Sequence, residues 1–311
     1  MMTKTYLVTG GAGFIGANLV RHLLTAGVQI RVLDNLSAGR RRDLAGLPVE
    51  FLEGDIRDAA MVRHAIQGVQ AIIHLAAHTD VVESVKSPEL NLEINVKGTF
   101  NLLQAAVQQG VSRFVFASTG GAIVGNVAPP VHEEMAPLPI SPYGAGKLAG
   151  EGYCSAFWGA YGLPTICLRF SNIYGPFSYH KGSVIAKFLR QIQQGEPLTI
   201  YGDGEQTRDF LYVEDLCRAI NRALEVDLPF GQAIQLGSGG ETNINQLVVA
   251  LGEMLGLDRL PPIRYAPPRP GEIFRNFVAI DRARKYLDFS PVTGLQVGLQ
   301  KTWEWFAGAG T

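Results

Sequence analysis

The protein has 311 residues, of which 47% are hydrophobic, and it carries a formal net charge of −1 at pH 7. This length predicts one large domain or two joined lobes with a sizeable core, and the near-neutral charge argues against a nucleic-acid partner. No apolar run approaches the ~20 residues that cross a bilayer. The three cysteines are widely spaced, which predicts reduced core thiols of a cytoplasmic protein. No spacing of cysteines and histidines predicts a metal site.

The first predicted elements are a strand at 6–9 and a helix at 14–26, joined by a glycine-rich turn. The glycines of this turn are Gly10, Gly11, Gly13 and Gly16. Glycine weakens strands and helices alike, so a cluster at this junction must serve something other than local stability. Backbone amides at a helix N-terminus attract phosphate, and a turn without side chains lets a pyrophosphate approach closely. The turn therefore predicts a dinucleotide site.

A second strand is predicted at 29–33, and Asp34 stands at its C-terminal end. An acidic residue about 20 positions beyond the glycines binds the ribose hydroxyls of NAD in such turns. Asp34 could instead serve only as a turn residue, but the register of strand, turn and helix favours the ribose role. Its charge also repels a 2′-phosphate, which favours NAD over NADP although three arginines follow at 40–42.

Further along, strand and helix patterns alternate. Strands are predicted at 49–53, 71–75, 113–118 and 164–170, and helices at 90–109 and 142–161. This alternation predicts an α/β fold with a doubly wound parallel (Rossmann) sheet, whose ligands bind at the carboxyl ends of the strands. We expect residues 1–175 to form the NAD-binding domain, with 209–236 returning to it. The remainder of 176–311 forms a smaller C-terminal substrate lobe.

The string "SPYGAGKLAGEGYC" places Tyr143 and Lys147 at i and i+4 on one face of a predicted helix. Tyrosine has an ordinary pKa of about 10 and is a poor base at neutral pH. A nearby ammonium, aided by a positively charged nicotinamide ring, would lower that pKa. Within a dinucleotide fold, Tyr143 is therefore a candidate acid–base group that exchanges a proton with a substrate hydroxyl.

Together, the glycine turn, "GDIRD", "HLAA", "FAST" and the Tyr-x-x-x-Lys pair resemble the extended short-chain dehydrogenase/reductase superfamily. The later strings "LRFSNIYGP", "LTIYGDGEQTRDFLYVEDL" and "PPRPGE" resemble its nucleotide-sugar epimerase/dehydratase branch, closest to bacterial UDP-glucose 4-epimerases. The resemblance covers nearly the whole chain. It implies NAD-dependent 4-epimerisation of a UDP-hexose, by transient oxidation and re-reduction at C4, in a homodimer joined through the helices at 90–109 and 142–161.

The resemblance also implies roles for single residues. Tyr143 and Lys147 would be catalytic, with the sugar oxygen bonded by Thr119 or by its neighbour Ser118. Cofactor contacts would come from Gly10, Gly13, Phe14, Ile15, Gly16, Asp34, Asn35, Asp55, Ile56, Leu75, Ala76 and Ala77, besides Tyr143 and Lys147. Substrate contacts would come from Thr119, from Asn172, Arg208 and Arg269 on the diphosphate, and from Glu272 on the uridine ribose.

Departures from the family pattern bear on the reaction. Dehydratases place an Asp-Glu pair after the threonine and decarboxylases keep a Glu, whereas Gly120 and Gly121 carry no proton, which favours epimerisation. The intact Tyr143 and Lys147 argue against a non-catalytic NAD-binding regulator.

Other departures leave the sugar open. Thr79 replaces a frequent Lys, Phe177 replaces a usual Arg, and Asn276 is too mid-sized to decide on N-acetyl groups. His180 and Lys181 would suit a carboxylate. We expect UDP-glucose/UDP-galactose first, with UDP-glucuronate as the main rival and UDP-N-acetylhexosamine as a further alternative.

Overall fold

The protein is described by a computed structural model that covers residues 4–256, 261–268 and 273–309. Within these residues, seven parallel strands form one sheet in the order β11–β6–β5–β4–β1–β2–β3. The strands are β1 (Thr5–Thr9), β2 (Gln29–Asp34), β3 (Val49–Glu53), β4 (Ala71–His74), β5 (Arg113–Thr119), β6 (Thr165–Phe170) and β11 (Ala233–Leu236). The order reverses between β1 and β4, and such a switch point opens a crevice at the carboxyl ends of the strands. The predicted doubly wound α/β fold is confirmed.

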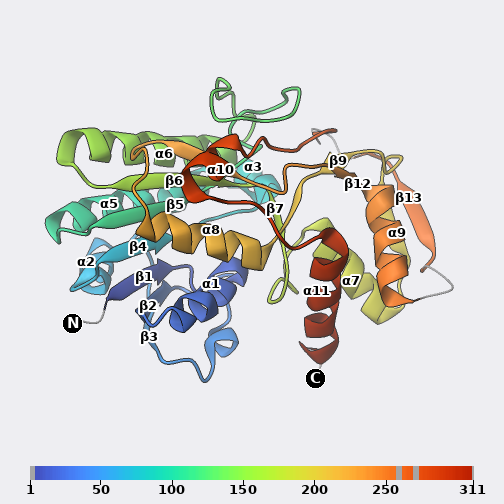
Figure 1. Ribbon diagram of the computed structural model, residues 1–311, viewed down its shortest axis with the longest axis horizontal. Helices are drawn as coiled ribbons and strands as arrows, with labels where there is room; N and C mark the ends of the chain where they lie inside the picture. Colours follow the sequence, from blue (N-terminus) through green and yellow to red (C-terminus); the bar gives the residue numbers. More distant parts are fainter. Residues whose placement is uncertain (1–3, 257–260, 269–272, 310–311) are drawn as a thin grey trace.

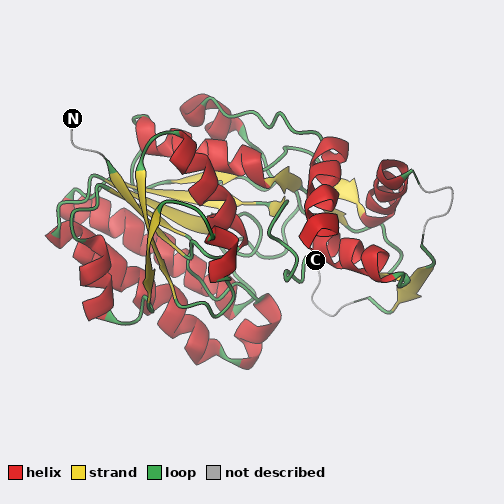
Figure 2. Ribbon diagram, turned by 90° about the horizontal axis from the view of Figure 1, so that it is seen from below, coloured by secondary structure: helices red, strands yellow, loops and turns green. Residues whose placement is uncertain are grey.

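Helices cover both faces of this sheet (Figure 1; Figure 2). They are α1 (Phe14–Thr25) and α8 (Val213–Glu225) on one face, and α2 (Ala59–Ile66), α5 (Thr99–Gln108) and α6 (Pro142–Tyr161) on the other. Each face has its own buried apolar cluster, one that includes Val8, Leu19 and Ile220 and one that includes Leu7, Leu102 and Phe114. Burial on both faces explains why these strands read as continuous apolar runs rather than as alternating patterns.

The helix predicted at 90–109 differs from the structure. It consists of α4 (Pro88–Leu92), a π-helical turn at Glu93–Gly98, and α5. The wider turn carries Asn95, whose side chain bonds both backbone groups of His78. The apolar spacing predicted the helix, but it could not predict the extra residue in this turn, since π-helical turns arise from such local bonds and frequently mark functional sites.

Most of the remaining elements gather beside the sheet, on the right of Figure 1, whereas α10 (Asp281–Leu287) packs on β11 and α8. Three short strand pairs lie here: β7 (Asn172–Tyr174) with β10 (Phe210–Tyr212), β8 (Leu198–Tyr201) with β13 (Ile263–Ala266), and β9 (Thr207–Arg208) with β12 (Thr242–Asn243). The helices are α7 (Val184–Gln194), α9 (Ile244–Leu255) and α11 (Leu295–Ala309). Of the segment 209–236, α8 packs on α1 and β11 joins the main sheet, whereas β10 pairs with β7 outside it.

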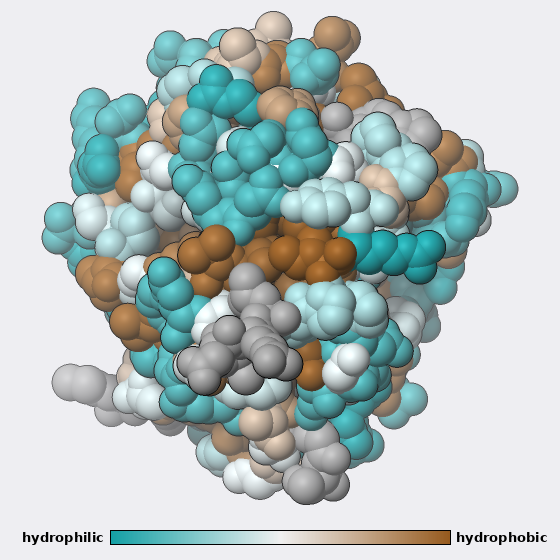
Figure 3. Space-filling view, turned by 90° about the vertical axis from the view of Figure 1, so that its right-hand side faces the viewer, coloured by the Kyte–Doolittle hydropathy of each residue, from teal (hydrophilic) through white to brown (hydrophobic). Residues whose placement is uncertain are grey.

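Seen from the side of these C-terminal elements, hydrophobic side chains gather in a band between hydrophilic regions (Figure 3). Among the described helices, none combines the length and the apolar character needed to span a lipid bilayer.

Candidate active site

The glycine turn between β1 and α1 is packed so tightly that two of its glycines are required by the chain itself. Gly10 has φ +70°, and a Cβ there would lie 2.7 Å from the backbone N of Ala76. A Cβ on Gly16 would lie 2.3 Å from the carbonyl oxygen of Gly10. Gly13 differs, because its Cβ would meet only that same oxygen, at 3.2 Å.

Gly13 is also the N-cap of α1. No side chain caps this helix start, and its first turn contains no acidic residue. The first N–H groups of α1 are therefore left without a side-chain cap, and the positive end of the helix dipole can attract a pyrophosphate. The absence of a side chain at position 13 lets that group approach. The turn fits a dinucleotide.

Asp34 is 7% exposed at the carboxyl end of β2. Its Oδ2 accepts from the backbone N–H of Ala12 at 2.9 Å and its Oδ1 from that of Leu36 at 2.8 Å. Burial raises the pKa of Asp34, and these two hydrogen bonds lower it. Asp34 thus fixes the turn, as the simpler interpretation expected, and its carboxylate oxygens keep lone pairs for ribose hydroxyls.

Asp55 follows β3 and lies next to Asn35, whose Nδ2 donates to Asp55 Oδ2 at 2.9 Å. A hydrogen bond from the Arg57 guanidinium, at 2.8 Å to the same carboxylate, is the main reason that the pKa of Asp55 is lowered to about 2. Ile56 is buried beside it. The structure therefore brings three of the predicted cofactor contacts, Asn35, Asp55 and Ile56, to one place beyond the carboxyl ends of β2 and β3.

His74, the last residue of β4, lies at the switch point of the sheet. Its Nδ1 is 2.8 Å from Thr9 Oγ1 and its Nε2 is 2.9 Å from Thr99 Oγ1. Burial, together with the charge of Lys147, lowers the pKa of His74 to about 3, so the ring is neutral. Thr9 Oγ1 also accepts from the N–H of Ala76 at 3.3 Å. His74 therefore joins the ends of β1 and β4 and is no proton donor to a substrate.

Asn95 and Asn91 are residues of this site that sequence reasoning missed. Asn95 Oδ1 accepts from the backbone N–H of His78 at 2.8 Å. The carbonyl of His78 accepts from Asn95 Nδ2 at 3.0 Å and from Asn91 Nδ2 at 3.2 Å. Both asparagines are at most 2% exposed. The signal available in the sequence was their i, i+4 spacing on the apolar face of a predicted helix, where a buried amide needs a partner.

Thr119 and Tyr143 form the candidate catalytic corner. Thr119 ends β5, Tyr143 stands in the first turn of α6, and the Thr119 side chain is close enough to Tyr143 to act on its pKa. Lys147 Nζ, one turn further on, donates to the carbonyl of Ala117 at 2.7 Å and lies 4.8 Å from the ring centre of Phe116. The predicted helix boundaries at 142–161 are confirmed, and the helix places both side chains toward the end of β5.

The predicted lowering of the Tyr143 pKa included the charge of a bound nicotinamide, and the chain alone does not lower that pKa. Burial raises the pKa of Tyr143 to about 12, and only the Thr119 hydrogen bond opposes this. Burial also lowers the pKa of Lys147 to about 8, against the opposing charge of Glu151. The ammonium is engaged by the Ala117 carbonyl, so desolvation outweighs its attraction for a phenolate. Deprotonation of Tyr143 is therefore disfavoured in the chain alone, and a bound nicotinamide would add a positive charge that favours it.

Ser118 points away from this corner. It is 4% exposed, and its hydroxyl donates to Glu151 Oε1 at 2.6 Å. Of the two hydroxyls proposed for the sugar oxygen, the one beside Tyr143 is that of Thr119.

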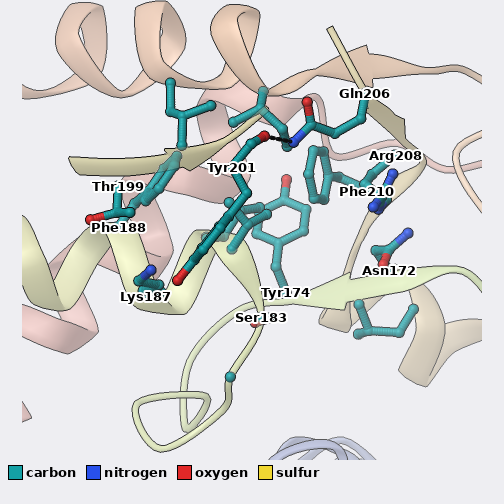
Figure 4. A pocket seen from close by; sticks show the side chains of 16 residues that line it. Asn172, Tyr174, Ser183, Lys187, Phe188, Thr199, Tyr201, Gln206, Arg208 and Phe210 are labelled. Atoms are coloured by element: carbon teal, nitrogen blue, oxygen red, sulfur yellow. Dashed lines mark hydrogen bonds between the residues drawn. The ribbon is translucent and has the colours of Figure 1, made fainter. Parts of the chain in front are cut away.

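A cavity of about 220 Å³ lies at the other end of the crevice, between α7, β7, β8 and β9. Its polar and aromatic lining includes Asn172, Lys187, Tyr201, Gln206 and Arg208 (Figure 4). Gln206 Nε2 donates to the Tyr201 carbonyl at 2.7 Å, and Lys187 Nζ lies 4.8 Å from the Tyr201 ring centre. Arg208 Nη1 donates to the carbonyls of Thr207 and Ile273, at 2.7 and 2.9 Å. The predicted contacts Arg269 and Glu272 lie outside the described residues.

Atoms of the chain itself lie close to the two glycines that follow Thr119, Gly120 and Gly121. A Cβ on Gly120 would lie 3.0 Å from Gln235 Oε1 and 3.2 Å from the Phe170 carbonyl, and one on Gly121 would lie 2.6 Å from Asn276 Nδ2. Among the described residues, no group of three or more His, Cys, Asp or Glu side chains could hold a metal ion.

Comparisons with known proteins agree with this geometry. Residues 6–237 match the model of the NAD-dependent epimerase/dehydratase family. The chain belongs to this family. It is 36% identical to a putative UDP-glucose 4-epimerase of Methanocaldococcus jannaschii over 303 residues, which cover 96% of this chain and 97% of that protein. Relatives named dTDP-glucose 4,6-dehydratase match over a similar length.

Two solved structures are similarly close. The UDP-glucose 4-epimerase of Thermotoga maritima with UDP-glucose is 37% identical, with a TM-score of 0.93 over 99% of this chain and 100% of that chain. The UDP-glucose 4-epimerase of Thermus thermophilus in complex with NAD is 37% identical, with a TM-score of 0.90 over 98% of this chain and 99% of that chain. The cofactor of this protein is NAD, and the glycine turn and Asp34 fit it.

Proposed function

We propose that this protein is an NAD-dependent 4-epimerase of a UDP-hexose, with UDP-glucose and UDP-galactose as its first substrates. The observation that carries the proposal is the Tyr143–Thr119 corner, followed by two glycines, which carry no acidic group. Family membership alone supports only the coarser statement, since the family includes dehydratases.

In this proposal Tyr143 takes the proton of the sugar's C4 hydroxyl, which Thr119 orients by a hydrogen bond. Bound NAD supplies the hydride acceptor and donor at C4. Lys147 stands one turn away to stabilise the phenolate and bond the nicotinamide ribose. After the 4-keto sugar has presented its opposite face, Tyr143 returns the proton. Positioned acid–base groups of this kind typically contribute 10²–10⁴-fold in rate.

A dehydratase or a decarboxylase needs more than this corner, because a further group must act beyond C4. Gly120 and Gly121 provide no such group, and the space beside them is occupied by Gln235, the Phe170 carbonyl and Asn276. The corner can therefore support oxidation and re-reduction at C4 and offers no further proton donor at these two positions.

At the nucleotide end, we propose that Asn172 and Arg208 bind the diphosphate, because both line the cavity and Arg presents a planar donor fork. Roles for Arg269 and Glu272 rest on the resemblance alone. Residues 1–175 with 209–236 would bind NAD, and the rest of 176–311 would bind the sugar nucleotide. The three cysteines are unpaired and buried, as expected for a cytoplasmic protein.

A uronate substrate is the second candidate, and one observation favours it. Desolvation lowers the pKa of Lys181, and the charge of Asp80, from a distant part of the chain, opposes part of this effect. Asp80 caps α3 (Val81–Lys86), which follows Thr79 and contacts α6. A cation here can meet a sugar carboxylate. The Phe177 side chain packs against other residues than Lys181. Its ring centre lies 4.2 Å from the Arg21 guanidinium carbon and 4.9 Å from the ring centre of Trp305.

We also propose a homodimer through α5 and α6. Several residues that suggested it are buried within the protomer, among them Leu103, Ala106 and Phe157. Tyr153, Trp158 and Tyr161 remain 39%, 39% and 62% exposed on α6. Light scattering at micromolar concentration tests this, since a monodisperse monomer would leave these side chains as isolated surface residues.

The experiment that tests the function is incubation of the purified protein with UDP-glucose, UDP-galactose, UDP-glucuronate and UDP-N-acetylglucosamine, without added NAD. We expect a C4 epimer as the product, separated by chromatography, first from the glucose/galactose pair. A product that has lost water would instead make the protein a dehydratase. Absence of any product would contradict the proposal.

A further inference from the structure

Three side chains of α6 share one face at intervals of four residues: Tyr143, Lys147 and Glu151. The first two belong to the catalytic corner. Glu151 touches neither a predicted cofactor contact nor a predicted substrate contact of the nucleotide cavity, and the mechanism above assigns it nothing.

The carboxylate of Glu151 joins three elements. Its Oε1 accepts from Ser118 Oγ on β5 at 2.6 Å and from Arg169 Nε on β6 at 2.8 Å, and its Oε2 accepts from Arg169 Nη2 at 2.7 Å. The side chains of Arg169 and Glu151 are 6% and 10% exposed. A paired carboxylate–guanidinium contact with two parallel bonds fixes direction as well as distance.

A buried ion pair adds little net stability, because desolvation of both charges offsets their attraction. What this one provides is geometry. Ser118 directly precedes Thr119, and Lys147 and Tyr143 lie one and two turns before Glu151. The carboxylate therefore links the strand end that carries Thr119 with the helix that carries the acid–base pair.

Helix α6 has particular need of such a link. It contains Gly144, Gly146 and Gly150, and glycine in a helix interior costs about 1 kcal/mol relative to alanine. The glycines allow a close approach, since a Cβ on Gly150 would lie 2.4 Å from the Phe116 ring and one on Gly144 2.1 Å from the Ala122 carbonyl. A helix with weak intrinsic stability and such close contacts depends on its partners for its position.

We propose that Glu151 is a positioning residue of the catalytic corner: through Ser118 and Arg169 it holds α6 against the ends of β5 and β6, so that Tyr143 meets Thr119 with Lys147 behind it. This rests on the proposed function only for the kinetic part of its test.

The same carboxylate acts on the charge of Lys147. The titratable groups that face Lys147 are Glu151 and Cys154 on α6, Cys167 on β6 and His74 on β4. Burial lowers the pKa of Lys147 to about 8, and Glu151 is the first of the groups that raise it. Lys147 is charged below its pKa, so removal of the Glu151 charge lowers that pKa and shortens the pH range of the ammonium from the alkaline side.

Two variants separate position from charge. Glu151→Asp keeps the charge but is one methylene shorter, so we expect kcat to fall about tenfold or more, because a misplacement of about 1 Å can cost ~10²-fold. KM should change by less than about threefold and the alkaline limb of kcat should stay near pH 8. Glu151→Gln should lower kcat as well, and should move that limb down by about 1 pH unit, the low end for loss of an opposite charge nearby.

A second measurement is independent of activity. In protein stripped of NAD, the lysine side-chain NMR titration, assigned with Lys147→Met, should show the Lys147 pKa lower in Glu151→Gln than in Glu151→Asp or the unmodified chain. If the unmodified chain acts on none of the UDP-sugars, the proposed function is refuted. The titration of Lys147 then decides alone whether Glu151 is a positioning residue.

The matched control is Asp215→Asn. Asp215 on α8 is 0% exposed, accepts from the N–H and hydroxyl of Thr293, both at 3.0 Å, and pairs with Arg218. It is a comparable buried carboxylate, on the opposite face of the sheet from α6. We expect a lower Tm with kcat and its pH profile unchanged. If both Glu151 variants lower only the Tm, with kcat, its pH profile and the Lys147 titration unchanged, Glu151 contributes only to stability and the inference is overturned.

Should Glu151→Gln fail to fold, Glu151→Asp and Ser118→Ala decide. Ser118→Ala removes one bond of the three and keeps both charges, so kcat should fall a few-fold with KM and the Lys147 titration unchanged. Unchanged kcat in both of these variants would overturn the inference.

Discussion

In the candidate catalytic corner, the chain itself engages the polar side chains: Lys147 donates to the Ala117 carbonyl, Ser118 donates to Glu151, and Thr119 lies beside Tyr143. At the nucleotide end, short strands surround a cavity of about 220 Å³ toward which Asn172 and Arg208 are directed (Figure 4). The first region is arranged before a ligand arrives, and the second is a space that a ligand fills. Substitutions should therefore lower kcat at one end and raise KM at the other, because groups that act only in the transition state and groups that only bind have different kinetic signatures.

The largest effect should come from Tyr143→Phe. Removal of the one hydroxyl that transfers the proton should lower kcat by about 10²–10⁴-fold. NAD content, measured after denaturation, and UDP binding should hardly change, since the ring and its packing stay. Retention of more than about a tenth of the activity would place the acid–base group elsewhere.

Arg208→Met should give the opposite kinetic pattern. Loss of hydrogen bonds to a charged diphosphate, at ~1.5–3 kcal/mol, should raise KM for the UDP-sugar about tenfold or more while kcat changes little. The control is Arg275→Met, which removes an exposed guanidinium paired with Glu241. Equal changes in the two variants would remove Arg208 from the diphosphate site.

Thr119→Ala should have a smaller effect, confined to kcat. One neutral hydrogen bond contributes about 0.5–1.5 kcal/mol, which corresponds to a loss of a few-fold to about tenfold. Ser118→Ala should cost less, because Ser118 acts only through Glu151. A greater loss in Ser118→Ala than in Thr119→Ala would mean that Ser118 is the hydroxyl that contacts the sugar.

Lys181→Met should have the smallest effect on UDP-glucose. If Lys181 bonds the sugar carboxylate, the same variant should raise KM for UDP-glucuronate by roughly tenfold or more, because a hydrogen bond to a charged group contributes ~1.5–3 kcal/mol. Kinetics on both sugars separate the cases. Equal loss on both would place Lys181 on the diphosphate or in the fold, and no loss on either would leave the uronate candidate without support.

The two ends also differ in how much the sequence predicted. Local patterns determined the glycine turn, Asp34 and the boundaries of α6, because each depends on residues close in the chain. The Glu151–Arg169 pair was missed, since it forms where distant segments meet, and the π-helical turn was missed because apolar spacing does not reveal one extra residue in a turn. The raised pKa of Tyr143 in the chain alone could not be predicted, because desolvation depends on the packing around the ring. Arg269 and Glu272 remain predictions.

The most direct test of the central claim follows one hydrogen atom. The purified protein, without added NAD, is given the UDP-hexose that it epimerises, carrying deuterium at C4, and the product is examined by NMR. The account predicts the C4 epimer with deuterium retained at C4, because the hydride leaves and returns within one enclosed site while Tyr143 moves only the hydroxyl proton. Deuterium at C6, or an epimer that has exchanged its C4 deuterium for solvent hydrogen, would contradict it.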